Sequence, residues 1–584
     1  MMIKLYFLAA VLIALGAHQE AADRENIFLQ EDTGGVSPSN HITAREEAPM
    51  FSWGDADTRY PQDHQPEPVA KTAFSYPAWR EERVFAQAVL YSGTPLENVL
   101  LTVSDLRCGK AAIPAGNVEI SPVGYVMADP YASKFNQCGV RIRKETDSLL
   151  VADRLDKNAP LSVAAGNTQP FWVKVSVPAD AQPGRYKGTV RLTADGIKAR
   201  TLPIELEVTG RLLPSPQDWT FHLDLWQNPY SVARYHGVPL WSREHLEAMR
   251  PVMKLLADAG QKSVTATLLD RPWNGQTEDP FASMVTKVLR ADGTWLYDYT
   301  AFDMWVSFME EIGIDGQINC YTIIPWALQF DYLDQATGKV VYVSGEVGSE
   351  PYKWYWEPFI ADFARHLREK GWLDKTYIAM DERPKEDMIA ALSMIRSAEP
   401  RMKVSLAGYY HEEYQAEIAD LCITTTQVFP SEVRAKRKAD GKISTFYTCC
   451  AEQFPNTFMV SPPVEAVWIP LYAAAAGFDG YLRWAYNSWT ADPVNDARFR
   501  TWTSGDCYLV YPDGRSSIRF DKLVEGIQLF EKVQVLRKEW KDDPVRSGEL
   551  EKMLSAFSID ATKQTHGACI SGDVAAARAI LNRK

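Results

Sequence analysis

The sequence lacks an apolar run long enough to cross a membrane. The stretch from Leu5 to Leu15 has about eleven residues, whereas a membrane-spanning helix needs about 20, and no later segment reaches that length. Lys4 precedes this stretch, and small residues around Gly16 follow it, which is typical of a secretory signal. We therefore predict a signal peptide over residues 1–17 and an exported mature protein, periplasmic or secreted, with no membrane span.

An excess of positive charge is also missing. The chain has 62 lysines and arginines against 75 aspartates and glutamates, for a net charge of −13. The basic residues are scattered, except for the short run Arg434 to Lys438, which we interpret as the solvated face of a helix. This balance argues against nucleic acid as a partner.

Motifs for cofactors and metals are absent as well. There is no P-loop, no dinucleotide fingerprint and no Gly-x-Ser-x-Gly elbow, and the sequence His411-Glu412-Glu413-Tyr414 lacks the second histidine of a zinc protease. The eight cysteines show no C-x-x-C spacing. Cys108 and Cys138 could form a disulfide or remain buried thiols, and the state of the neighbours Cys449 and Cys450 stays open. We expect a hydrolase that needs no cofactor and no metal.

The first part of the chain reads as a β domain. Residues 18–70 are polar and rich in proline and predict an extended lead-in. Residues 71–214 contain short runs of β-forming residues separated by turn-rich stretches, which indicates a β-sandwich. The runs are Val84 to Tyr91, Val99 to Val103, Phe171 to Val177, Tyr186 to Leu192 and Ile204 to Val208.

Residues 215–545 alternate between strand and helix patterns, which is the signature of a parallel sheet with crossover helices. Eight such units predict a (β/α)8 TIM-type barrel, with an open doubly wound sheet as the alternative. An amphipathic helix over Ile518 to Lys538 would close the barrel wall, and residues 546–584 predict a helical tail. The eight strands are Phe221 to Trp226, Ser263 to Leu269, Gln317 to Ile324, Thr376 to Met380, Lys403 to Leu406, Leu421 to Thr425, Ser444 to Tyr447 and Gly480 to Trp484.

Two adjacent carboxylates follow the fourth of these strands. Asp381 and Glu382 come directly after Met380, and Pro384 ends the strand. Carboxyl groups that share a pocket repel each other's second charge, so that one stays protonated while the other stays ionised. The alternative is a helix start with acids near its positive end. Because active sites of TIM barrels lie at the carboxyl ends of the strands, the barrel prediction favours catalysis.

Aromatic and hydrogen-bonding residues follow several of the other predicted strands. Apolar faces of sugar rings pack on aromatic side chains, and sugar hydroxyls need polar groups, so this composition predicts a carbohydrate pocket. The residues are Trp226 to Asn228, Trp326, Tyr409 to His411, Tyr447, Thr448, Trp484, Tyr486, Asn487 and Trp489.

Four stretches of the chain resemble glycoside hydrolase family 123, and the likeness extends over about residues 75–540. The resemblance implies a β-sandwich followed by a (β/α)8 barrel, and β-N-acetylgalactosaminidase activity by a retaining, substrate-assisted mechanism like that of family 20 hexosaminidases. The stretches are Ala78 to Val84 with Ala86 and Gln87, Tyr377 to Pro384, Phe446 to Cys450, and Gly480 to Trp489 continuing through Gly505 to Tyr508.

Carried onto this sequence, the resemblance makes Glu382 the general acid and then base, and Asp381 the group that orients and stabilises the substrate's 2-acetamido group. Tyr447 is the candidate for holding the acetamido carbonyl, and Trp484 or Trp489 for walling its methyl group. The sequence does not separate galacto from gluco sugars. A β-hexosaminidase for N-acetylglucosaminides and a non-catalytic carbohydrate-binding protein on a degenerate barrel remain alternatives.

Overall fold

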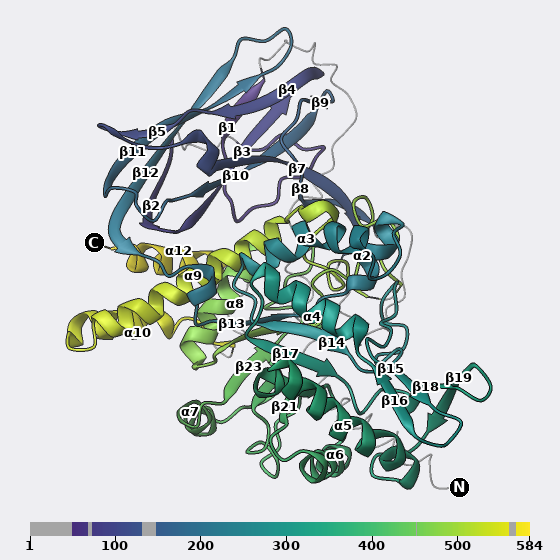
Figure 1. Ribbon diagram of the computed structural model, residues 1–584. Coiled ribbons are helices and arrows are strands. Elements are labelled where there is room, and N and C mark those ends of the chain that lie inside the picture. Colours follow the sequence, from purple (N-terminus) through teal and green to yellow (C-terminus); the bar gives the residue numbers. More distant parts are fainter. Residues whose placement is uncertain are drawn as a thin grey trace, which may run out of the picture. The chain divides into compact units, whose positions relative to one another are not determined.

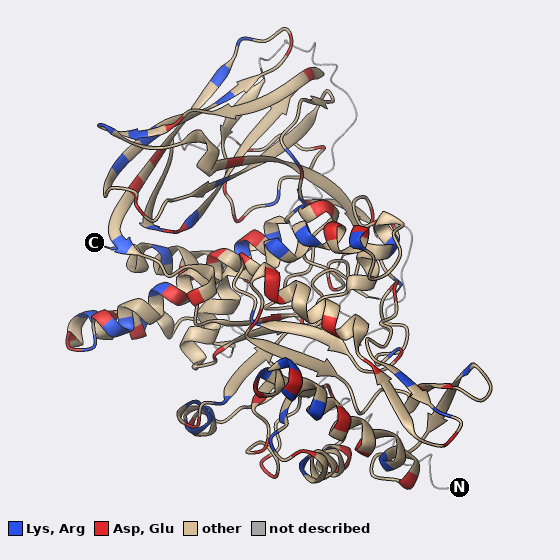
Figure 2. Cartoon of the chain, viewed as in Figure 1, with Lys and Arg blue, Asp and Glu red and all other residues tan. Residues whose placement is uncertain are grey.

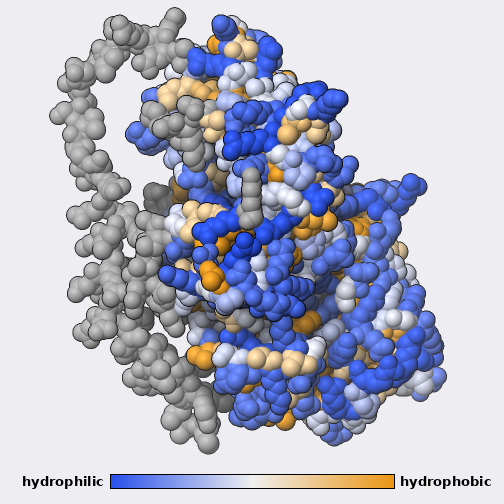
Figure 3. Space-filling model, turned by 90° about the vertical axis from the view of Figure 1, so that its left-hand side faces the viewer, coloured by the Kyte–Doolittle hydropathy of each residue, from blue (hydrophilic) through white to orange (hydrophobic). Residues whose placement is uncertain are grey.

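A computed structural model describes residues 49–67, 73–130, 148–450, 452–500, 502–559 and 568–583. The predicted signal peptide and most of the predicted lead-in lie outside these residues. No helix within the described ranges is both long and apolar enough to cross a membrane. The face in Figure 3 is largely hydrophilic, with its hydrophobic residues in small groups.

The N-terminal domain is a β-sandwich of two sheets, as predicted (Figure 1). Apolar side chains of both sheets fill the space between them, including Trp53, Phe171, Tyr186 and Ile204. The five-stranded sheet has the order β1 (Met50–Trp53), β3 (Arg83–Ser92), β10 (Asn167–Ser176), β7 (Val118–Ala128) and β8 (Leu149–Leu155). The other sheet contains β2 (Phe74–Arg80), β12 (Arg200–Leu212), β11 (Gly184–Thr193), β4 (Leu96–Val103) and β9 (Leu161–Val163), with β5 (Leu106–Cys108) and β6 (Ala111–Ile113) beside β11.

The sandwich begins before residue 71, which corrects the prediction of an extended lead-in up to residue 70. Strand β1 pairs antiparallel with β3, with Met50 opposite Tyr91. Trp53 is buried, and its Nε1 donates a hydrogen bond to the carbonyl of Pro203. The strand was missed because a four-residue apolar run inside polar, proline-containing sequence has too few residues to show alternation.

The second domain is a barrel of eight parallel strands, and all eight predicted strands are present (Figure 1). Parallel strands covered on both faces read as continuous apolar runs, which made them visible in the sequence. Their order is β13 (His222–Leu225), β24 (Gly480–Arg483), β23 (Ile443–Tyr447), β22 (Asp420–Thr424), β21 (Lys403–Gly408), β20 (Thr376–Met380), β17 (Gln317–Tyr321) and β14 (Ser263–Thr267).

Two glutamine side chains help to close the barrel between its first strands, β13 and β14. The only backbone link here in the described residues is around Leu223, whose carbonyl accepts from Lys262 N at 3.0 Å. Gln261 Oε1 accepts from Leu225 N at 3.0 Å, and Gln227 Oε1 accepts from Thr265 N at 2.8 Å. These amides take the place of ladder hydrogen bonds, so the seam leaves few backbone groups unpaired.

Helices cover the outside of the barrel (Figure 1). Most of them lie where amphipathic stretches follow the predicted strands, and α9 covers the helix predicted to close the wall. They are α2 (Pro229–His236), α3 (Arg243–Ala257), α4 (Thr300–Ile312), α5 (Glu350–Lys370), α6 (Lys385–Ala398), α7 (Ser431–Ala439), α8 (Pro463–Ala476) and α9 (Ile518–Glu539). Two further helices, α10 (Pro544–Leu554) and α12 (Ala568–Leu581), pack on α8 and α9.

The basic run predicted as a solvated face lies on α7, and the prediction is wrong for one member. Arg437 is buried, and its guanidinium donates to Ser444 Oγ at 2.9 Å and to the carbonyls of Gln415, Ile418 and Ile443. The side chain ties the helix to the neighbouring loops, which a local charge pattern cannot reveal.

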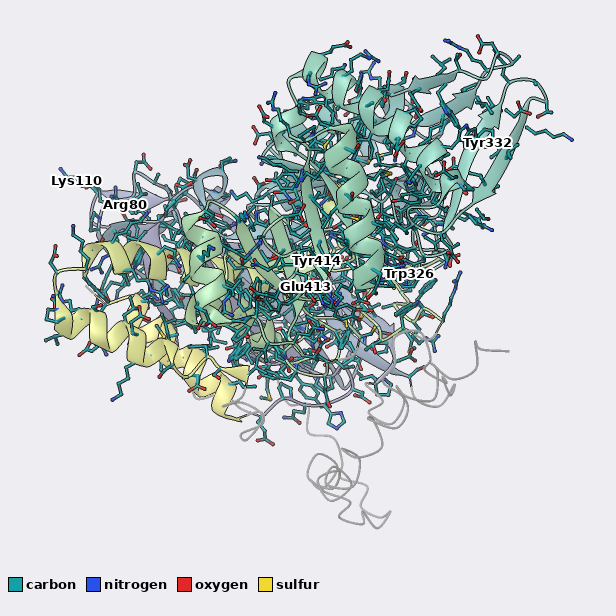
Figure 4. All side chains as sticks on the ribbon, turned by 90° about the horizontal axis from the view of Figure 1, so that it is seen from below. Arg80, Lys110, Trp326, Tyr332, Glu413 and Tyr414 are labelled. Carbon is teal, nitrogen blue, oxygen red and sulfur yellow. The ribbon has the colours of Figure 1, made fainter. Side chains whose placement is uncertain are left out.

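A small sheet that the sequence did not predict interrupts the barrel between β14 and α5. It consists of β15 (Thr286–Leu289), β16 (Trp295–Asp298), β18 (Gln329–Asp334) and β19 (Lys339–Ser344). One face packs on α5 through aromatic contacts such as Trp295 with Tyr355, whose ring centroids are 5.8 Å apart. Figure 4 shows Tyr332 of this sheet set apart from Trp326.

The two domains meet along α9. Gln528 of this helix bonds both backbone groups of Arg83, accepting from the N–H at 2.7 Å and donating to the carbonyl at 2.9 Å. Lys532 Nζ lies 2.6 Å from Glu82 Oε1, with both side chains buried. Figure 2 shows charges of both signs along this helix.

Candidate active site

Asp381 and Glu382 lie between β20 and α6, at the carboxyl end of the barrel strands. The residue that caps α6 is Pro384, and no side chain bonds the helix start there, whereas the acids of its first turn are Glu386 and Asp387. The structure therefore does not use the pair as a helix cap, and the position matches the place where barrels build active sites.

A pocket opens at this end of the barrel around both acids. Residues from the ends of several strands and from the loops that follow them form its wall. The lining residues are Trp226, Trp273, Gln276, Trp326, Asp381, Glu382, Ala407, Tyr447, Thr448, Cys449, Cys450, Leu482, Trp484 and Trp502.

Asp381 is buried, and each of its carboxylate oxygens faces a donor. Trp326 Nε1 donates to Oδ2 at 2.7 Å, and Arg383 Nε lies 3.0 Å from Oδ1. The Arg383 guanidinium also lies 5.4 Å from the centre of the Trp326 ring, so the two side chains brace one another. Burial raises the pKa of Asp381, while Arg383 and then Trp326 oppose that rise.

Glu382 is more exposed and accepts a short hydrogen bond from the hydroxyl of Tyr447. Desolvation by the pocket wall raises the pKa of Glu382; the Tyr447 hydrogen bond lowers it, and the nearby Asp381 carboxylate raises it further. A carboxyl group with a raised pKa at the mouth of a pocket is suited to give and take a proton near neutral pH.

Five tryptophans supply most of the apolar wall. Trp226 and Trp273 stack with ring centroids 5.1 Å apart, and Trp484 and Trp502 lie 5.8 Å apart. Trp326 is 39% exposed and lines the pocket. Flat, rigid rings of this kind can pack against the apolar face of a sugar ring.

A buried network supports the loop that follows β23. Arg483 and Asp506 form a fully buried ion pair at 2.8 Å, and Arg483 also donates to Asn456 Oδ1 at 2.9 Å. Glu452 accepts from Cys449 N at 2.9 Å. These contacts hold the segment that carries Thr448, Cys449 and Cys450 into the pocket wall.

The structure brings seven of the predicted residues to the pocket and leaves others out. Asp381, Glu382, Trp226, Trp326, Tyr447, Thr448 and Trp484 line the pocket, whereas Tyr486, Asn487 and Trp489 are fully buried away from it. The chain turns after β24, so these three side chains enter the barrel wall. They donate there from Tyr486 Oη to Val252 O, from Asn487 Nδ2 to Asn228 O and from Trp489 Nε1 to Val510 O, each at 2.8 Å.

Sequence reasoning missed Trp273, Gln276 and Trp502. They come from long loops after β14 and β24 rather than from strand ends, and only the folded chain brings those loops to the pocket. The one sequence signal that could have found Trp273 and Trp502 is a tryptophan in a loop that follows the carboxyl end of a strand.

Most of the cysteines in the described ranges are free thiols. Cys450 is in a disulfide bond, while Cys108, Cys320, Cys422 and Cys507 are free thiols; Cys138, the predicted alternative partner of Cys108, lies outside the described residues. Across the described ranges, no group of three or more histidines, cysteines or acids is arranged to hold a metal. His411 contacts Tyr414, and Glu413 pairs with Lys385 at 2.9 Å on an exposed loop.

Comparisons with known proteins identify the family of this chain. The glycoside hydrolase 123 catalytic domain matches residues 226–536, and the N-terminal domain of the same family matches residues 53–194. The structure is similar to that of a family 123 glycoside hydrolase from Clostridium perfringens, with a TM-score of 0.83 and 25% identity over 91% of this chain and 98% of the other.

Two further solved structures show much weaker likeness. A candidate glycoside hydrolase from Bacteroides vulgatus has a TM-score of 0.31 and 8% identity over 80% of this chain and 79% of its own. A Bacteroides ovatus xyloglucanase has a TM-score of 0.28 and 7% identity over 82% of this chain and all of its own. Among curated protein sequences, none matches. On its family matches, which cover more than half of the residues, this chain belongs to glycoside hydrolase family 123 and is a glycosidase.

Proposed function

We propose that this glycosidase removes terminal β-linked N-acetylgalactosamine from glycans or glycolipids, and that the substrate's own 2-acetamido group is the nucleophile. One observation carries the mechanism. Asp381 and Glu382 are consecutive residues at the end of one strand, and they are the only carboxylates among the described residues that line the pocket.

This arrangement fits poorly with a nucleophile supplied by the enzyme. An ordinary retaining glycosidase holds two carboxyl groups about 5 Å apart on opposite sides of the sugar, and an inverting enzyme separates them further to admit a water. Consecutive residues on one loop approach the sugar from the same side. If the acetamido oxygen attacks instead, no carboxylate is needed on the far face.

The chemistry then proceeds in two steps. Glu382 gives its proton to the glycosidic oxygen, the bond from that oxygen to C1 breaks, and the acetamido oxygen forms a bond to C1. Ionised Asp381 accepts the amide N–H and stabilises the positive charge of the oxazolinium-like ring. Glu382 next takes a proton from water, whose oxygen bonds to C1 as the ring opens, and the configuration at C1 is retained.

Tyr447 and Trp484 support the acetamido group in this proposal. Tyr447 donates to Glu382 in the structure, so holding the acetamido carbonyl requires its hydroxyl to turn toward the substrate. Trp484 lines the pocket and can wall the methyl group, whereas buried Trp489 cannot.

The identity of the sugar and the choice of glycolipids as substrates are inferred from the family. The galacto preference follows the resemblance, and the Clostridium perfringens relative was analysed for glycolipid glycan hydrolysis, which supports including glycolipids. Export is supported by the apolar stretch after Lys4. Sequencing the N-terminus of the protein recovered from the periplasm or medium tests export.

Release of p-nitrophenol tests the activity. We expect turnover of the β-N-acetylgalactosaminide, less or none of the N-acetylglucosaminide, and none of the plain β-galactoside, which has no acetamido group. Asp381→Asn should lose rate without rescue by azide, because the missing group is not the nucleophile. Hydrolysis of the plain galactoside, or azide rescue, would contradict the mechanism.

A further inference from the structure

An exposed tyrosine stands beside the proposed general acid, just outside the pocket. Strand β21 pairs in parallel with β20, with Leu406 opposite Met380, so Gly408 and Tyr409 come level with Glu382 and Arg383. A Cβ atom on Gly408 would lie 3.3 Å from Cα of Glu382, which shows how closely the two chains approach. Glycine at this position leaves room for the backbone that carries the acid.

Strand β21 ends at Gly408, next to the pocket. Ala407 lines the pocket, and Tyr409 follows the last residue of β21 at the level of Arg383, whose Nε lies 3.0 Å from Asp381 Oδ1. Partial burial raises the pKa of the Tyr409 phenol, and the Glu382 carboxylate raises it further; Cys449 and Asp381 also act on it, while Arg383 opposes the rise. Both pocket acids thus lie within electrostatic reach of the Tyr409 phenol.

The Tyr409 side chain is partly exposed and has no hydrogen-bonding or aromatic partner among the described residues. It is 37% exposed, and within the described part of the chain its hydroxyl makes no hydrogen bond and its ring makes no contact with another ring. Neighbouring Tyr410 differs, because its ring packs on Phe429 at 5.3 Å and its hydroxyl donates to Glu412. Packing and hydrogen bonding therefore account for an aromatic side chain at Tyr410, but not for the one at Tyr409.

The loop after β22 lies against the loop that carries Tyr409. Gln427 Oε1 accepts from Tyr410 N at 3.1 Å, which holds the loop after β22 against the loop after β21. Val428, the following residue, is 82% exposed. An exposed ring and an exposed aliphatic side chain thus lie on neighbouring loops.

The position of Tyr409 matters for substrate binding if Glu382 is the general acid, and the inference rests on that part of the proposed function. The acid protonates the glycosidic oxygen, so the sugar ring on the other side of that oxygen must lie next to Glu382 and outside the pocket that holds the terminal sugar. We propose that Tyr409 is the binding site for this leaving-group sugar, and that its ring packs against the apolar face of a pyranose.

Two substrates with the same terminal sugar test this site. One is the disaccharide in which β-N-acetylgalactosamine is linked to galactose, and the other is methyl β-N-acetylgalactosaminide, which has no second ring. For Tyr409→Ala, we expect kcat/KM on the disaccharide to fall about tenfold, mainly through KM, and kcat/KM on the methyl glycoside to stay within about twofold. Tyr409→Phe keeps the ring and should stay near the wild type on both.

The control variant is Tyr342→Ala, which removes a tyrosine that is 51% exposed on β19 and should change neither substrate. Equal losses on both substrates, or no loss on the disaccharide, would overturn the proposed site, since both outcomes mean that the ring does not bind the leaving group. If the wild type released sugar from neither substrate while remaining folded, the proposed function itself would fail, and the inference with it.

Discussion

The two acids of the pocket and a buried acid at the domain interface have opposite electrostatic surroundings. At the interface, Asp153 is fully buried, and Arg519 donates to it through Nε and Nη2 at 3.0 to 3.1 Å. Arg59 and the Tyr511 hydroxyl also donate to this carboxylate. Burial alone would raise the pKa of Asp153, but Arg519 and Arg59 together lower it below the ordinary value.

In the pocket the balance is reversed. The donors around Asp381 and Glu382 are one arginine, one indole and one phenol, and the pKa of each carboxyl stays raised. The interface thus keeps its acid ionised over a wide pH range, whereas the pocket leaves the protonated form accessible. The first arrangement suits a structural ion pair, and the second suits proton transfer.

The largest effect on activity should come from Glu382→Gln. We expect kcat to fall about a thousandfold, because an amide cannot give the proton, and general acid catalysis is worth roughly 10² to 10⁴. The free energy of unfolding should not fall, since the amide oxygen can still accept from Tyr447. Steady-state kinetics and urea unfolding measure the two quantities.

Glu386→Gln is the matched control, because this acid is exposed in the first turn of α6 and does not line the pocket. It should keep wild-type activity. Survival of most activity in Glu382→Gln would show that another group is the acid.

At the interface, Arg519→Met should reduce the free energy of unfolding by about 3 to 5 kcal/mol, because it leaves Asp153 buried without its main partner. Urea unfolding followed by fluorescence gives the value. Arg365→Met removes an exposed arginine that pairs with Asp362 and Glu369 on α5, and it should cost less than about 1 kcal/mol. Similar losses in the two variants would mean that burial does not distinguish these ion pairs.

Arg383→Met should make the pocket less able to ionise Asp381. Without the guanidinium, the pKa of Asp381 rises further, so the acidic limb of the kcat/KM profile should move to higher pH by about one unit. Arg383→Lys keeps a positive charge, so its acidic limb should lie close to that of the wild type. Arg401→Met, which removes an exposed partner of Asp374, is the control, and an unmoved limb in Arg383→Met would show that Arg383 does not tune Asp381.

Glu465, a buried acid outside the pocket, can be compared with the two pocket acids. Glu465 at the start of α8 accepts from Asn456 N at 2.9 Å and forms no ion pair with the described residues, and burial raises its pKa from 4.5 to about 8. The folded protein therefore holds a proton here that the unfolded chain releases above about pH 4.5. This contribution to stability is complete below pH 4.5 and is lost as the pH rises to about 8, at about 1.4 kcal/mol per pH unit.

Glu465→Gln should remove that slope, so that the free energy of unfolding changes less between pH 7 and pH 8 than in the wild type. Urea unfolding at the two pH values measures the difference. An unchanged slope would mean that Glu465 is ionised in the folded protein. The case also shows that a raised pKa marks a catalytic acid only where the group faces a pocket.

Local sequence patterns were sufficient for the barrel and its two acids. Each barrel strand is a short apolar run bounded by turn residues, and Asp381 and Glu382 follow one of them directly. Patterns of this kind were insufficient for β1, whose four residues show no periodicity, and for the small sheet, whose strands pair across a long insertion.

The sequence by itself determined the (β/α)8 fold and the placement of Asp381 and Glu382 at a strand end, because burial on both faces of a parallel sheet imposes an apolar pattern that is visible along the chain. Only the tertiary structure decided which aromatic residues form the pocket. Trp273 and Trp502 enter it from distant loops, while Tyr486 and Trp489 find partners inside the wall. The direction of a side chain beyond a strand end depends on contacts with segments far away in the sequence, and no local pattern records those contacts.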